Sequence, residues 1–114
     1  MKTITIEEIM AQQEQDRADI LENSDRGGSA WELASMALRY SGSGSEAAAK
    51  LLLAMEHGKP FNFELLLRFD STNRAHADLV LMGYRPHELW PSKWMNDAGI
   101  DGAGVMRDLL EKWG

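Results

Sequence analysis

Residues 46–58 read EAAAKLLLAMEHG, and this stretch decides the fold class because its signals define a helix from its start to its end. Upstream, Ser43 and Glu46 have the spacing of a capping box, which opens helices. Gly58 suits the left-handed position that follows a helix, and Pro60 is unable to continue one. The sequence therefore predicts a helix that ends at Gly58.

Two helices are predicted before this stretch. TIEE at residues 5–8 is a capping box, and we expect the helix that it opens to reach about Leu21. Its interior is polar nearly all round, so it is either poorly packed alone or docked through a few apolar side chains. Those side chains are Ile6, Ile9, Met10, Ile20 and Leu21. After the break at NSDRGGS, Ser29 and Glu32 form a second capping box, which opens a helix with a buried apolar face.

Further helices are predicted after Gly58. Asn62 is placed to cap one short helix, and Asp70 is placed to cap another that reaches Gly83. Gly99 reads as a helix stop, and Asp101 as the cap of a last helix with apolar residues at helical spacing. No segment has a convincing strand pattern. The sequence thus predicts an all-α fold, a compact single-domain bundle of five or six short helices.

The charge of the chain limits the classes of partner. The formal net charge is −6 and the sequence pI is about 5.0, which argues against direct nucleic-acid binding. Residues 1–29 hold seven acids and three bases (7 − 3, net −4), whereas residues 30–114 hold eleven and nine (11 − 9, net −2). We therefore expect an acidic N-terminal helical arm over residues 1–28 and a helical domain over residues 29–114.

Cysteine content and hydropathy point to a reducing, aqueous compartment. The chain has no cysteine, which excludes disulfides, thiolate zinc sites and a cysteine nucleophile. No window approaches the roughly 18 apolar residues of a membrane span, and the N-terminal residues lack a long apolar signal region. We expect a cytoplasmic protein of a bacterial or infected host cell, with no membrane partner.

The segment FDSTNRAHADLVLMG, residues 69–83, gathers side chains from which hydrolytic sites are built. A helix turns about 100° per residue, so Ser71 and His76 point in very different directions and form no local pair. His76 falls between apolar neighbours and is predicted to be a hydrogen-bonded histidine at the edge of the core, with a functional role as the alternative. Arg74 and Asp78 have the spacing of an ordinary ion pair on a helix.

No metal or cofactor site is predicted. His87 and Glu88 begin an H-E-x-x-H pattern, but Pro91 stands where the second histidine is needed. An enzyme that uses His76 or His87 with scattered acids remains an alternative, and we predict that the protein is not an enzyme. The acids of that alternative are Asp70, Asp97 and Asp101.

Two surfaces are predicted to bind a partner. Trp, Tyr and Arg supply much of the binding energy at protein interfaces, and such residues gather in the proline-bearing segment 84–94. The alternative is that its tryptophans fill the core. The second surface is the acidic N-terminal segment, with a solvated polar helix as the alternative. The predicted partner-binding residues are Tyr84, Arg85, His87, Trp90, Lys93 and Trp94 in the first, and Glu14, Asp16 and Asp19 in the second.

The C-terminal part of the chain contains the segments SEAAAKLLLAMEHGKPFNFELLLRFD, HADLVLMGYRPHELWP and EKW. Together these segments resemble a family of short uncharacterised all-helical proteins. That family is carried by bacterial phages, plasmids and integrative elements, and the resemblance covers roughly residues 45–113. The residues that match are Leu51, Leu52, Leu53, Ala54, Gly58, Phe61, Phe63, Leu66 and Asp70. The resemblance implies a genetic context and brings no catalytic residues with it.

In this context we expect a non-catalytic protein-binding protein of a mobile genetic element. Its sharpest form is an inhibitor of a host defence system, similar to anti-CRISPR proteins, that occludes a basic or nucleic-acid-binding surface of a host or element-encoded protein. The alternative is a self-associating structural or accessory protein of a phage or plasmid, for which a homodimer is expected.

Overall fold

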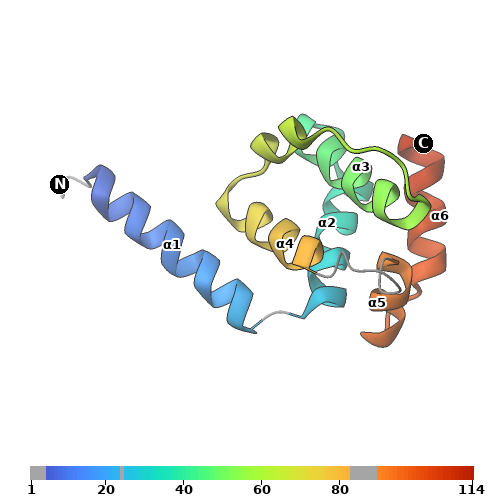
Figure 1. Ribbon diagram of the computed structural model, residues 1–114, viewed down its shortest axis with the longest axis horizontal. Helices are drawn as coiled ribbons and strands as arrows, with labels where there is room; N and C mark the ends of the chain where they lie inside the picture. The colour runs from blue at the N-terminus through green and yellow to red at the C-terminus, as the bar shows by residue number, and fades with distance from the viewer. Residues whose placement is uncertain (1–4, 24, 83–89) are drawn as a thin grey trace.

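The computed structural model describes residues 5–23, 25–82 and 90–114, and within these ranges it contains helices and no strand (Figure 1). The all-α fold class predicted from the sequence is confirmed. The helices are α1 (Ile6–Asn23), α2 (Arg26–Arg39), α3 (Ser43–His57), the 3-10 helix η1 (Phe63–Arg68), α4 (Ser71–Met82), α5 (Pro91–Asp97) and α6 (Gly102–Trp113).

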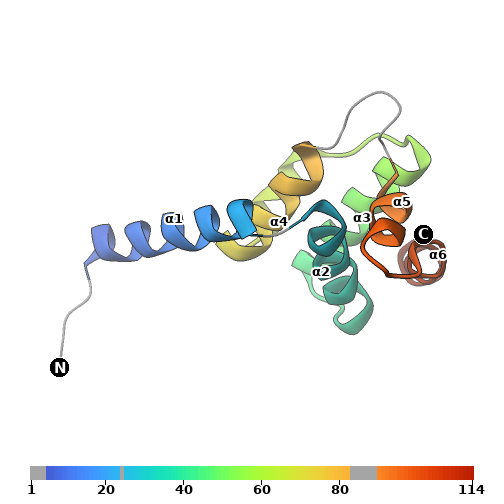
Figure 2. The ribbon, with the colours of Figure 1, turned by 90° about the horizontal axis from the view of Figure 1, so that it is seen from below.

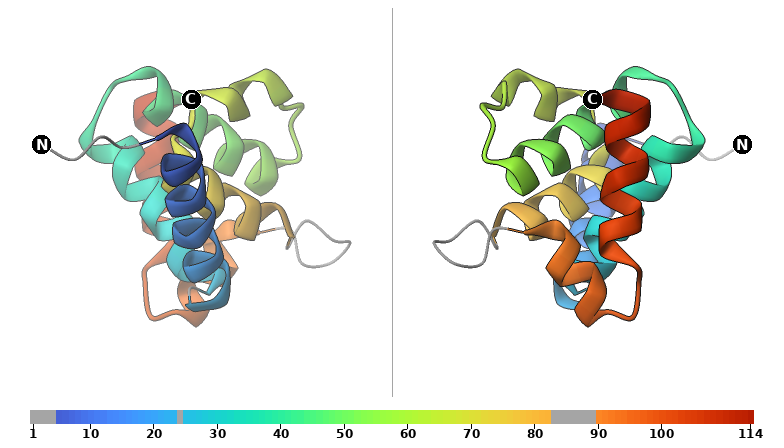
Figure 3. Two further views of the ribbon diagram at one scale, coloured as in Figure 1. Left: turned by 90° about the vertical axis from the view of Figure 1, so that its left-hand side faces the viewer. Right: turned by 90° about the vertical axis from the view of Figure 1, so that its right-hand side faces the viewer.

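Helix α2 is the centre of the fold and contacts α3, α4, α5 and α6. Three alanines of α2, Ala30, Ala34 and Ala37, are fully buried, and such small side chains let neighbouring helices approach closely. On the far side, α6 lies beside α3 and α5 (Figure 3). The largest fully buried apolar side chains of the core are Leu33, Leu51, Leu52, Met95, Leu109 and Val80.

Two glycines allow α5 to pack closely against α2 and α6. A Cβ at Gly27 of α2 would overlap the backbone oxygen of Trp94, and a Cβ at Gly102 of α6 would overlap the backbone of Ser92. Only glycine allows backbones to approach so closely. The same α5 receives a cap from α3, where the Glu56 carboxylate accepts hydrogen bonds from the Ser92 backbone N–H (3.1 Å) and from its hydroxyl.

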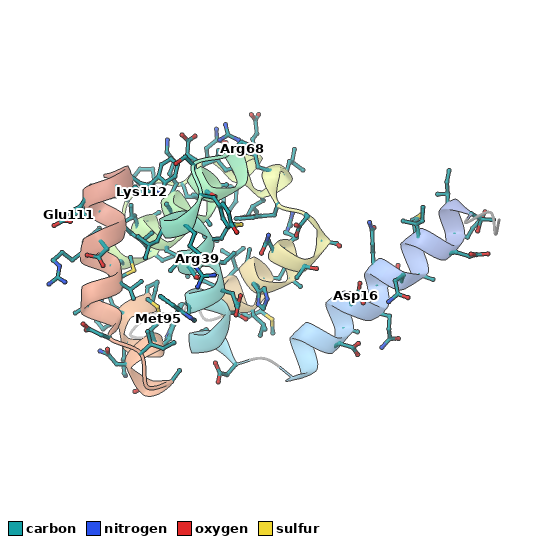
Figure 4. All side chains as sticks on the ribbon, turned by 180° about the vertical axis from the view of Figure 1, so that it is seen from behind. Asp16, Arg39, Arg68, Met95, Glu111 and Lys112 are labelled. Atoms are coloured by element: carbon teal, nitrogen blue, oxygen red, sulfur yellow. The ribbon has the colours of Figure 1, made fainter. Side chains whose placement is uncertain are left out.

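The C-terminal end of α2 is capped by α6. The Lys112 ammonium donates hydrogen bonds to the backbone oxygens of Ala37 (2.8 Å), Leu38 (3.0 Å) and Tyr40 (2.7 Å), as its position beside the end of α2 in Figure 4 illustrates. The indole N–H of Trp113 donates to the Ala37 oxygen as well (2.9 Å). The last carbonyl groups of a helix lack partners within it and carry partial negative charge, so an ammonium group suits them.

Five predicted helix boundaries are confirmed by their capping bonds or backbone angles. Side-chain oxygens of Thr5, Asn62, Asp70 and Asp101 accept from backbone N–H groups two or three residues later, at 2.8 to 3.2 Å. Gly58 has a φ of +64°, in the left-handed region expected of it. The helix after Asn62 is a 3-10 helix rather than an α-helix.

Two predicted capping boxes are wrong. Helix α2 begins at Arg26 with Asp25 as its cap, so Ser29 is a buried residue inside the helix. Gly27 and Gly28 looked like a break, but the close approach of α5 requires glycine at the first of these positions. Helix α3 begins at Ser43 with Gly42 as its cap residue, and no side chain caps it because glycine has none; Glu46 accepts a hydrogen bond of 2.8 Å from Arg68.

Helix α1 lies at one end of a molecule that measures 48 × 27 × 23 Å (Figures 1 and 2). It contacts α4, and its N-terminal half projects beyond the other helices. The division into an acidic arm and a domain stays a prediction, and its boundary after residue 28 falls inside α2. Within the described ranges, no helix has the length and apolar character needed to cross a membrane.

Candidate functional site

The ambiguous histidine of the sequence has a serine partner from another helix. His76 Nδ1 on α4 lies 2.9 Å from the Ser29 hydroxyl oxygen on α2. Burial lowers the pKa of His76 below its usual value, and the negative charges of Glu32 and Asp70 oppose this shift. The neutral imidazole is therefore favoured, since burial penalises the charged form.

This pair is structural in character. Ser29 has an exposed fraction of 0%, so a substrate cannot reach its hydroxyl in this conformation. A nucleophilic serine needs access as well as a nearby base. The prediction of a hydrogen-bonded histidine at the core edge is confirmed, and its hydroxyl partner is Ser29. The sequence placed Ser71 nearer, and nothing in the spacing pointed to a serine 47 positions away.

The remaining chemical candidates stay apart. His57 is exposed at the end of α3, and Asp97 and Asp101 are exposed around α5 and α6, while His87 lies outside the described residues. In the part of the chain that the structure describes, no three histidine or acidic side chains are grouped so that they would hold a metal ion.

The predicted tryptophan surface is divided by burial. Trp90 is 48% exposed and Lys93 is exposed, so both are accessible. Trp94 is 8% exposed and packs in the core, with the Arg26 guanidinium 5.3 Å from its ring centroid. The other members of this surface, Tyr84, Arg85 and His87, lie outside the described residues.

The predicted acidic surface lies on α1. Glu14 is exposed, and Asp16 and Asp19 each accept a hydrogen bond of 2.9 Å from the glutamine four residues earlier on the helix. Figure 4 shows Asp16 about midway along α1. Glu14 and Asp19 are therefore exposed on α1, as a binding surface requires, whereas Asp16 is half-buried.

Helix α1 also exposes apolar side chains. Ile6 is 74% exposed, Ile9 47% and Met10 55%, and the turn of the helix places all three on one side. The same geometry places Glu14 along one edge of this stripe and Asp16 along the other. We refer to Ile6, Ile9 and Met10 with these two acids as the α1 stripe. The sequence left open whether this helix is poorly packed alone or docked through its apolar residues, and no described part of this copy covers the exposed faces of Ile6, Ile9 and Met10.

A groove of about 460 Å³ lies between α3, the segment after it, η1 and the end of α6. We call it the α3–α6 groove. Its cationic residues are Lys50, Lys59 and Arg68, and its apolar residues include Leu53, Leu65, Leu110 and Trp113. Arg68 binds Glu46 at 2.8 Å, and this hydrogen bond is the main reason why the pKa of Glu46 is lowered.

Lys50 and Lys59 differ from Arg68 because they make no ion pair with any residue that the structure describes. The groove lining therefore has three cationic side chains, Lys50, Lys59 and Arg68, and one acidic side chain, Glu46, whose pKa the charge of Lys50 also lowers. Sequence reasoning missed it because its residues come from four separate segments, and no local pattern brings them together.

The chain was also compared with known proteins. No protein-family model, curated protein or solved structure matches it. The resemblance to the mobile-element family therefore stays a prediction, and the proposals below depend on the residues of the chain itself.

Proposed function

We propose that this chain is a non-catalytic protein-binding protein that uses α1 as its docking element. The observation that carries the proposal is the α1 stripe, in which three apolar side chains are 47 to 74% exposed between acidic neighbours. Removing such side chains from water favours association, at about 25 cal/mol per Å² of apolar surface. Flanking acids select a partner surface that is apolar in the middle and basic around it.

The sharper form of the proposal is inhibition of a host defence system. An acidic helix suits a basic surface that otherwise holds nucleic acid, because both ligands compete for the same positive charges. What supports this form is the net charge of α1, which has six acids and one base (6 − 1, net −5), together with the family resemblance of residues 45–113. The exposed Trp90 and Lys93 offer a second contact surface.

Affinity capture from a bacterial lysate, with quantitative identification of the bound proteins, tests the proposal. Ile9→Asp places a charge in the stripe, and the matched Ala11→Asp places the same charge on the opposite side of the same exposed helix. We expect a partner that is retained by the wild type and by Ala11→Asp and lost by Ile9→Asp. A set of bound proteins that is the same for all three would overturn α1 as the docking element.

A further inference from the structure

We propose that two copies of this chain form a symmetric dimer in which α1 of each copy lies in the α3–α6 groove of the other. The inference rests on the proposed function, because it takes α1 as the docking element and names a second copy as a partner. It is carried by the complementarity between two surfaces of the same chain.

The first surface is the α1 stripe. Its apolar side chains recur at positions i, i+3 and i+4, which is how an amphipathic helix presents anchors to a hydrophobic groove. Acids flank these anchors on both sides, and the helix as a whole has a net charge of −5. An occupant of this kind needs a groove with an apolar lining and basic edges.

The α3–α6 groove has this composition. Leu53, Leu65 and Leu110 offer apolar contacts, and the three cationic side chains of the groove, Lys50, Lys59 and Arg68, outnumber its one acidic side chain, Glu46. In a chain with a net charge of −6, this is a local excess of positive charge. Opposite charges across the rim steer association and fix the orientation of the helix.

The two surfaces lie too far apart to meet within one copy. Figure 1 shows α1 at one end of the long axis of the molecule and α6 at the other, and that axis measures 48 Å. A second copy with its long axis reversed brings its groove to the projecting end of α1. Both copies then exchange the same contact, so a two-fold axis closes the assembly as a dimer.

Sedimentation equilibrium of the full chain over a range of concentrations, at low and at high salt, measures this dimer. Ile9→Asp removes one apolar anchor from each of two grooves, and we expect about a hundredfold weaker dimerisation, since each anchor contributes about tenfold. Ala11→Asp has the same charge on the opposite side of the helix and should dimerise like the wild type. The dimer should weaken as salt rises, because the rim charges are exposed.

Mixing two defective variants provides the decisive test. Lys50→Glu combined with Lys59→Glu spoils the groove and leaves α1 intact, while Ile9→Asp spoils α1 and leaves the groove intact. A homodimer of either variant has no contact between an intact α1 and an intact groove. The mixed dimer has one such contact, between α1 of the lysine variant and the groove of the Ile9→Asp variant. In an equal mixture, native mass spectrometry should therefore show the mixed dimer well above the roughly twofold excess over each homodimer that random pairing gives. Arg107→Glu reverses an exposed cation on α6 outside the groove; it serves as the control for charge reversal and should dimerise normally.

Three results would overturn the inference. These are a strict monomer at all concentrations, equal dimerisation by Ile9→Asp and Ala11→Asp, and a mixed dimer that is no more abundant than random pairing gives. The affinity capture from a lysate tests the proposed function independently of the dimer. A monomer that still captures a foreign partner through Ile9 leaves that function standing, whereas a dimer with no such foreign partner supports the inference and removes the inhibitor role.

Discussion

Replacing Lys112 by Met is expected to destabilise the fold by removing the cap that α6 provides to α2. The substitution keeps an unbranched apolar stem and deletes the ammonium that donates to three backbone oxygens at 2.7 to 3.0 Å. A net hydrogen bond to a charged group stabilises by about 1.5 to 3 kcal/mol, but water replaces the donor at exposed carbonyl groups. Trp113 still donates to Ala37 in the variant.

The expected loss is therefore about 1 to 2 kcal/mol, which includes the favourable interaction of a cation with the negative end of α2. For a domain of this size that loss lowers the Tm by about 4 to 8 °C. Thermal unfolding followed by circular dichroism measures it, with Lys93→Met as the control, since Lys93 is an exposed helical lysine with no hydrogen bond to a carbonyl among the described residues. Equal Tm values for the two variants would refute the capping role of Lys112.

Two further predictions concern α5 and the half-buried His76. Gly102→Ala places a methyl group against the Ser92 backbone and should lower the free energy of unfolding in urea by about 1 to 3 kcal/mol. Gly44→Ala, also in the first turn of a helix, is the control and should be neutral or stabilising. Equal losses for the two variants would contradict the packing argument. Because burial lowers the pKa of His76, the unfolded chain takes up a proton that the folded chain resists, so stability should be full above the unfolded pKa of about 6.5 and fall as the pH drops below it. His76→Asn should flatten this dependence of the urea midpoint on pH, and an unchanged slope would show that other groups cause it.

Most helix boundaries were predictable because their signals are local. A cap needs only a side chain and a backbone N–H two or three residues away, as at Asn62 and Asp70. The prediction of a capping box at Ser29 failed because Gly27, which weakens a helix locally, is required inside α2 by the contact with α5. Local preference lost to packing at that position, because the approach of two backbones excludes every larger residue.

The candidate site was only partly predictable. The exposed acids and the apolar positions of α1 follow from helical periodicity within one segment. The burial of Trp94 and the exposure of Trp90 were not predictable from the sequence. Both tryptophans lie in one short segment, four positions apart, and only the packing of α5 against its neighbours places one in the core and the other in solvent. The α3–α6 groove had no sequence signal, since Lys50 and Leu110 are remote in the chain and meet only after folding.

The sequence by itself determined the all-α class, the acidic character of the N-terminal helix and most of the caps, because periodicity, charge and capping act within a few residues. Only the tertiary structure decided the hydrogen-bond partner of His76, the capping of α2 by Lys112 and the exposure of the α1 stripe. These features depend on which helices become neighbours. Which helices pack together depends on how well whole helix faces fit, such as the alanine-rich surface of α2. A local sequence pattern does not predict that fit.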